Sequence, residues 1–198
     1  MTNVKLVSRA KLVAMSLMFA PGAAEAHLVE TGLGPVYDGV AHFALSPEYC
    51  VPIVGAALYA GLRGKIQARS AIVLLPLCWL VGSLLGGLPS VPGLIAPPWL
   101  VLMLVGGFIA ADVPLSVGAS GFFVGAIGLA LGFSSGMATA QYGQFIRPAL
   151  GSTAAIFVVT ALAAAAANAT FGWIRIAVRV VGSWVAASGL LLLGWVLH

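Results

Sequence analysis

The chain has 198 residues, of which 61% are hydrophobic and only 7% are charged, whereas an ordinary soluble domain carries roughly 25% charged residues. Nine basic and five acidic side chains are too few to coat a soluble core, so the composition excludes a soluble globular domain. The basic residues are thinly spread and form no patch with aromatic residues, which argues against a nucleic-acid partner. The sequence therefore predicts a chain whose main solvent is membrane lipid.

The first 26 residues have the features of a secretory signal peptide. A basic start at 5–11 precedes a short apolar stretch, 12–19, and small residues lead up to a cleavage site after Ala26. The apolar stretch is shorter than the ~20 residues of a membrane-spanning helix, although an uncleaved anchor is the alternative. Cleavage after Ala26 would make His27 the new N-terminus and would start the mature chain outside the cytoplasmic membrane.

The remaining residues, 27–198, contain a series of apolar segments separated by Gly, Pro and polar residues. The predicted spans are about 47–62, 69–88, 97–111, 114–132, 149–168 and 173–197. Segments of alternating hydrophobicity, which a membrane β-barrel requires, do not occur. We therefore expect an all-α integral membrane protein, folded as a compact bundle of six transmembrane helices.

Charge bias predicts the orientation of this bundle. With an exported start, the loop at 63–69 and the connection at 170–175 fall on the cytoplasmic side, where most of the basic residues of 27–198 lie, while Arg147 falls outside. The expected location is the inner membrane of a bacterium, with both mature termini on the periplasmic side.

Residues 97–132 are too long for one span, since 36 residues would make a helix of roughly 54 Å. The sequence Asp112-Val113-Pro114 is the breaker near their middle, so a turn is expected there, with Asp112 close to the inner interface. Small residues recur at helical spacing on two spans and predict close helix packing. These residues are Gly121, Gly125, Gly128 and Gly132, and Gly82 and Gly86.

Acidic and histidine side chains gather before and at the start of the first span. Between His27 and Glu48 lie three of the four acidic residues that follow residue 26 and two of the three histidines. Imidazole and carboxylate are common ligands of nickel, cobalt, copper and zinc. Asp38 and His42 would share one face of a helix, where Asp38 would bind the same ion or orient the imidazole. We expect a metal site from these residues, with His27 adding its α-amine and ring.

Plainer interpretations stand beside this one. Ser46-Pro47-Glu48 is also a typical helix start, with Ser46 as N-cap and Glu48 at the positive helix end. His42 alone would also fit an interfacial histidine bonded to backbone, and Cys50 and Cys78 fit small hydrophobic residues. The chain has no Walker loop, Rossmann glycine fingerprint, HExxH or GxSxG motif, so an enzyme is not expected.

The exported start, six spans and histidine-acid motif together resemble the HupE/UreJ family of nickel/cobalt permeases over essentially the whole chain. The first-span signature of that family, His-x5-Asp-His, falls on His42, then five residues, then Glu48-Tyr49. Asp112 leads a segment that resembles the start of the family's middle span. A later family motif with two histidines falls near 133–139, where this chain has neither histidine.

The resemblance implies a divalent-metal permease, in which His42, Glu48 and Asp38 capture nickel, cobalt or copper outside and Asp112 assists deeper in the bundle. Binding would weaken below about pH 6, because imidazole ordinarily protonates near pH 6.5. The alternative is a membrane subunit of the same origin that has lost transport and packs against a partner protein or a second copy. No tightly bound cofactor is expected, and the expected partners are membrane lipid and the metal ion.

Overall fold

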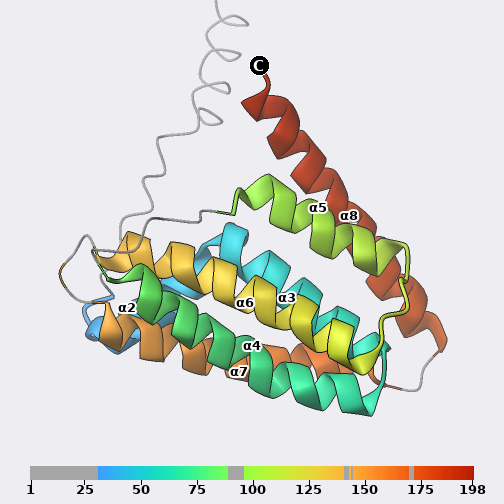
Figure 1. Ribbon diagram of the computed structural model, residues 1–198, viewed down its shortest axis with the longest axis horizontal. Helices are drawn as coiled ribbons and strands as arrows, with labels where there is room; N and C mark the ends of the chain where they lie inside the picture. The colour runs from blue at the N-terminus through green and yellow to red at the C-terminus, as the bar shows by residue number, and fades with distance from the viewer. Residues whose placement is uncertain (1–30, 89–95, 141–142, 144, 170–171) are drawn as a thin grey trace, which may run out of the picture.

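The computed structural model describes residues 31–88, 96–140, 143, 145–169 and 172–198, and over these residues it is all-helical, without a strand (Figure 1). The helices in this part of the chain are α2 (Pro35–Leu45), α3 (Pro47–Leu62), α4 (Lys65–Gly86), α5 (Pro98–Ala110), α6 (Val117–Ala140), α7 (Ile146–Ala167) and α8 (Gly172–Val196). The expected signal peptide and His27 lie outside the described residues.

Four of these helices, α4, α6, α7 and α8, are long and apolar enough to cross a membrane. Helices α2 and α3 together pass the same test but bend by 75° at Ser46, and α5 is a shorter apolar helix of 13 residues. The described residues therefore contain four candidate spans, or five if the bent pair counts as one, which fits a helical, multi-pass membrane protein; the expected count of six is not confirmed.

The bounds of α3 to α8 lie within three residues of the predicted spans, with two larger differences, and α2 precedes the first predicted span. Helix α4 begins at Lys65, four residues before the expected start. Helix α6 continues to Ala140, two turns beyond the expected end at 132. This extension is stable in an apolar setting because Gly136 packs on the backbone of α4, and because the Thr139 hydroxyl donates to the carbonyl oxygens of Ser135 and Gly136, at 3.0 and 3.1 Å.

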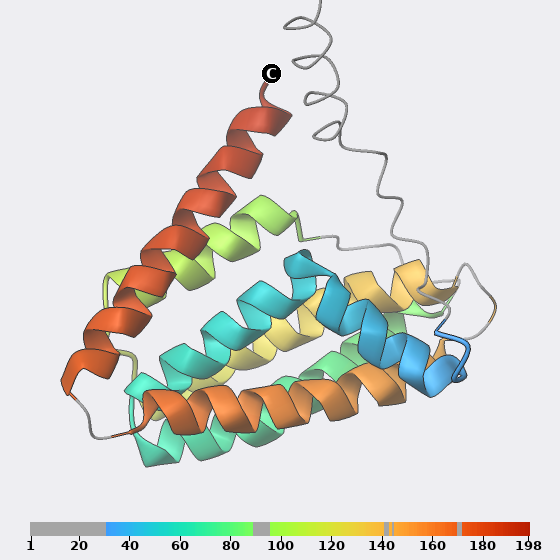
Figure 2. The ribbon, with the colours of Figure 1, turned by 180° about the vertical axis from the view of Figure 1, so that it is seen from behind.

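The helices form a main bundle and a leaning pair. In the bundle, α4 and α6 make the most extensive contact, α7 packs on α3 and α4, and α2 lies on the first half of α7. The largest fully buried side chains of its core include Trp79, Tyr59, Ile53 and Leu75. Helices α5 and α8 pack mainly on each other, and α8 diverges from the bundle toward the C-terminus (Figures 1 and 2).

Glycines bring α4 and α6 together, which confirms the close packing predicted from their spacing, although the spacing did not tell which helices would pair. A Cβ atom on Gly128 or Gly132 would collide with the backbone of α4, and one on Gly82 or Gly86 would collide with the backbone of α6. The other two residues of the predicted stripe, Gly121 and Gly125, face only side chains of α4. The close approach therefore lies toward the C-terminal half of α6.

Candidate metal site at the start of α3

His42 lies on α2 and is buried, with 5% of its surface exposed. Its ring centroid is 5.4 Å from that of Tyr49, the residue that follows Glu48 in α3. The His42 Nε2 atom has no hydrogen-bond partner among the described residues. Because a buried polar atom without a partner is rare in native structures, this atom calls for an explanation.

Asp38 is also on α2, one turn before His42, so the helix expected from their spacing is present. The carboxylate is already engaged locally. Its Oδ1 atom accepts hydrogen bonds from the backbone N–H and the hydroxyl of Thr31, both at 2.7 Å. Asp38 thus holds the segment that enters α2, which accounts for a carboxylate in the first turn of that helix.

Glu48 occupies the first turn of α3, after Ser46 at the N-cap and Pro47, as the sequence predicted. The Ser46 hydroxyl, however, makes no capping hydrogen bond. Ser46 is buried at the bend where α2 ends and α3 begins, and its carbonyl oxygen accepts from the N–H groups of Tyr49 and Cys50 at 3.0 and 2.9 Å. Helix α3 therefore begins without a capping hydrogen bond from a side chain.

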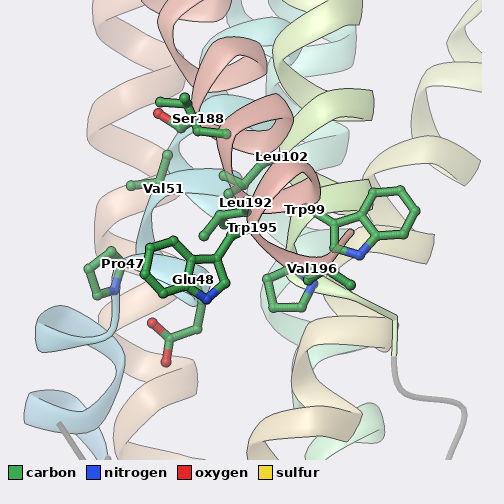
Figure 3. A pocket seen from close by; sticks show the side chains of 11 residues that line it. Pro47, Glu48, Val51, Trp99, Leu102, Ser188, Leu192, Trp195 and Val196 are labelled. Atoms are coloured by element: carbon green, nitrogen blue, oxygen red, sulfur yellow. The ribbon is translucent and has the colours of Figure 1, made fainter. Parts of the chain in front are cut away.

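Glu48 borders two hollows. The smaller is a cavity of about 290 Å³ between the starts of α3 and α5 and the second half of α6, and Glu48, Tyr49, Ser134 and Met137 are among its lining residues. The larger is a groove of about 860 Å³ between α3 and the α5–α8 pair (Figure 3). The small cavity offers a carboxylate, two hydroxyls and a thioether as candidate donors, but His42 is not among the residues that line it.

The sequence did not single out Ser134 or Met137 as site residues. Met137 belongs to no repeated Met pattern, and Ser134 lies where the resembled family would have histidines. The structure brings both next to Glu48 and Tyr49, which carry the first-span motif. The only hint in the sequence was the position of both residues within 133–139, where the HupE/UreJ family has its later histidine motif. Because this chain lacks both histidines of that motif, the sequence did not mark the segment as part of a site.

Asp112 lies far from this site, at the opposite end of α3. It sits in the expected turn between α5 and α6, with a left-handed φ of 53°. Its carboxylate pairs with Arg63, which follows the last residue of α3, and accepts a hydrogen bond from Arg175 Nε at 2.7 Å. The structure therefore does not bring Asp112 to His42, and its carboxylate is occupied by two guanidinium groups.

Further polar contacts surround Asp112 and tie together the turns at this end of the molecule. The Tyr59 hydroxyl donates to the carbonyl oxygen of Val113 at 2.8 Å. Gln67 Nε2 donates to the carbonyl oxygen of Leu115 at 3.2 Å, and Arg179 Nε donates to that of Ala110 at 3.1 Å. Asp112 is thus the centre of a structural network.

Within the described part of the chain, no three His, Cys, Asp or Glu side chains come together as a group that could hold a metal ion. The His42 ring packs on Tyr49, next to Glu48 in the sequence, whereas Asp38 is bonded to Thr31 and Asp112 is remote. No family model, curated protein or solved structure matches the chain. The HupE/UreJ resemblance stays a prediction from the sequence.

Proposed function

We propose that the chain is a HupE/UreJ-like membrane protein that takes up a divalent transition metal, nickel or cobalt, from outside the membrane. His42 and Glu48 are the first ligands, at the start of α3. The observation that carries the proposal is the buried His42 imidazole, whose Nε2 atom has no partner among the described residues and whose ring packs on that of Tyr49, the residue after Glu48. A metal ion would use that nitrogen, and the carboxylate would offset part of its charge.

Mixed nitrogen and oxygen donors suit Ni²⁺, Co²⁺ or Cu²⁺ better than Mg²⁺, which prefers oxygen ligands, or Cu(I), which prefers sulfur. Two protein ligands leave coordination positions open. The hydroxyls and the thioether of the cavity beside Glu48, water, and the amine of a processed His27 are the candidates for these positions. Such a weakly held ion fits a passage site better than a structural site.

The topology proposed with this function has six spans, α3 to α8, after removal of residues 1–26. The turns that follow α3, α5 and α7 meet near Asp112, and most basic residues of the described chain lie at this end. These are Arg63, Lys65, Arg69, Arg175 and Arg179. Arg147 lies at the other end, in the first turn of α7. This bias supports a cytoplasmic Asp112 end and periplasmic mature termini in a bacterial inner membrane.

The second candidate is a membrane subunit that derives from such a permease and no longer transports. The absence of a three-ligand group among the described residues favours it, together with the missing histidines near 133–139. This reading predicts that the chain works by packing against a partner.

Uptake of labelled Ni²⁺ or Co²⁺ by cells that express the chain separates the two candidates. The permease proposal predicts uptake above background, a loss in His42→Ala and a smaller loss in Glu48→Gln. The histidine matters more because water can replace a carboxylate oxygen, while the imidazole supplies the nitrogen ligand. Background uptake in wild-type cells, with the protein present in the membrane, would favour the subunit.

A further inference from the structure

The larger groove beside Glu48 is a second candidate site, distinct in chemistry from the metal site. Its walls are apolar and come from three helices, with Val51 on α3, Leu102 on α5 and Leu191 on α8 (Figure 3). Its volume of about 860 Å³ falls within the ~300–1,000 Å³ typical of small-molecule sites. The groove lies along apolar helices, so its natural occupant is a molecule of the bilayer.

One end of the groove, where α3 and α5 begin and α8 ends, is charged and aromatic, unlike the apolar walls. Glu48 and Trp195 lie close together at this end, Trp99 lies across the groove beyond Val196, and Glu48 is the only charged residue among those that line the groove (Figure 3). The two ion pairs of the described residues are both made by Asp112, so neither occupies Glu48. A carboxylate beside an indole ring is a combination that recognises organic ammonium groups.

The same end offers positive partial charge. Helices α3 and α5 both have proline in the first turn, and neither receives a side-chain capping bond. Proline has no N–H, and the N–H groups of Tyr49 and Leu100 bond to the carbonyl oxygens of Ser46 and Pro97. The N–H groups of Glu48 and Trp99 are therefore the donors left in these first turns, and such donors favour anionic groups. Tryptophans at the ends of apolar helices also mark the headgroup level of a membrane. This end of the groove therefore presents one negative group and two positive helix ends at headgroup depth.

We propose that the groove binds a phospholipid with an ammonium headgroup. The ammonium lies against Glu48 and the Trp195 ring, the phosphate faces the starts of α3 and α5, and an acyl chain follows the apolar wall along Leu102 and Leu191. The lipid occupies the space that the leaning α5–α8 pair leaves beside α3 and so fills the seam between the two parts of the bundle. This binding needs no metal at His42.

Native mass spectrometry of the full chain tests the proposal. The protein is purified in detergent with a metal chelator and mixed with equal amounts of phosphatidylethanolamine and phosphatidylglycerol that carry the same acyl chains. We expect about five-fold or greater retention of phosphatidylethanolamine, which corresponds to ~1 kcal/mol. Glu48→Gln should bring the ratio near one, and Glu48→Asp should restore part of it. Equal retention of both lipids by the wild-type chain would overturn the proposal.

Two tryptophans on one helix provide a matched control. Trp195 and Trp184 both lie on α8 and are 81% and 71% exposed, but only Trp195 lines the groove. Trp195→Leu should lower the preference for phosphatidylethanolamine, and Trp184→Leu should leave it unchanged. Equal losses in both variants would show general lipid contact and would contradict a site at the groove. His42→Ala should keep the lipid preference while it loses metal, which separates this proposal from the proposed uptake function.

Discussion

Replacement of Asp112 by Asn is expected to lower the free energy of unfolding by about 3–5 kcal/mol, because it leaves the buried guanidinium of Arg63 without its countercharge. The side chains of Arg63 and Asp112 are only 10% and 11% exposed. Asn is the suitable substitution, since it tolerates the left-handed φ of 53° and so changes the charge while it leaves the backbone unstrained. Unfolding in mixed micelles, followed by loss of helical circular dichroism, measures the effect.

Arg175 provides the control, because its side chain pairs with the same carboxylate but is 62% exposed. Arg175→Gln should change the unfolding free energy by less than about 1 kcal/mol. The double variant Arg63→Met with Asp112→Asn removes both buried charges and should recover most of the stability. If Asp112→Asn is as mild as Arg175→Gln, the Arg63–Asp112 pair does not hold the ends of α3 and α5 together.

The second large effect is expected at Gly136, where α6 lies on the backbone of α4. A Cβ atom there would collide with the carbonyl group and Cα of Ser83, and backbone atoms cannot move aside as a flexible side chain can. We expect Gly136→Ala to destabilise the protein by about 1–3 kcal/mol, although Ala favours helix more than Gly. The thermal midpoint of unfolding in detergent reports this loss.

Gly118, near the start of the same helix, is the matched comparison. A Cβ atom at Gly118 meets nothing within 4 Å, so Gly118→Ala should be neutral or stabilise the helix by up to about 1 kcal/mol. The two identical substitutions are therefore expected to move the thermal midpoint in different ways. Equal shifts for both would mean that close backbone packing does not limit the α4–α6 contact.

The positions of the helices were predictable because apolar length and helix breakers are local properties of the sequence. The start of α3 at Pro47 and the turn at Asp112 both follow from single prolines and polar residues in apolar surroundings. The glycine spacing also predicted a close helix neighbour for α6. Spacing alone could not identify α4 as that neighbour, because the glycines of α6 contact backbone atoms of α4, and every residue type has the same backbone atoms.

The polar network at Asp112 was not predictable, since it joins residues far apart in the chain. Asp112 and Arg175 are 63 residues apart, and the contact depends on how the α5–α8 pair meets the end of α3. Charge bias predicted that most arginines lie at one end of the bundle, but it did not predict that Arg63 and Arg175 pair with Asp112. The expected metal role of Asp112 came from the resemblance, and only the fold shows that the carboxylate is held by guanidinium groups.

The candidate site was predictable only in part. The spacing of Asp38 and His42 predicted one helix, and that helix is present. Its 75° bend into α3, the burial of His42 against Tyr49 and the approach of Met137 all depend on tertiary packing. A local pattern therefore suggested candidate ligand residues. The cavity beside Glu48 could not be predicted, because it depends on how α3, α5 and α6 are arranged in space.

The most direct test of the proposed function is the Ni²⁺ or Co²⁺ content of the purified full-length protein, measured by elemental mass spectrometry after loading and removal of free ion. The account predicts bound metal in the wild-type chain and a fall to background in His42→Ala. Absence of bound metal, or equal metal in His42→Ala and wild type, would contradict the claim that the start of α3 is a metal site.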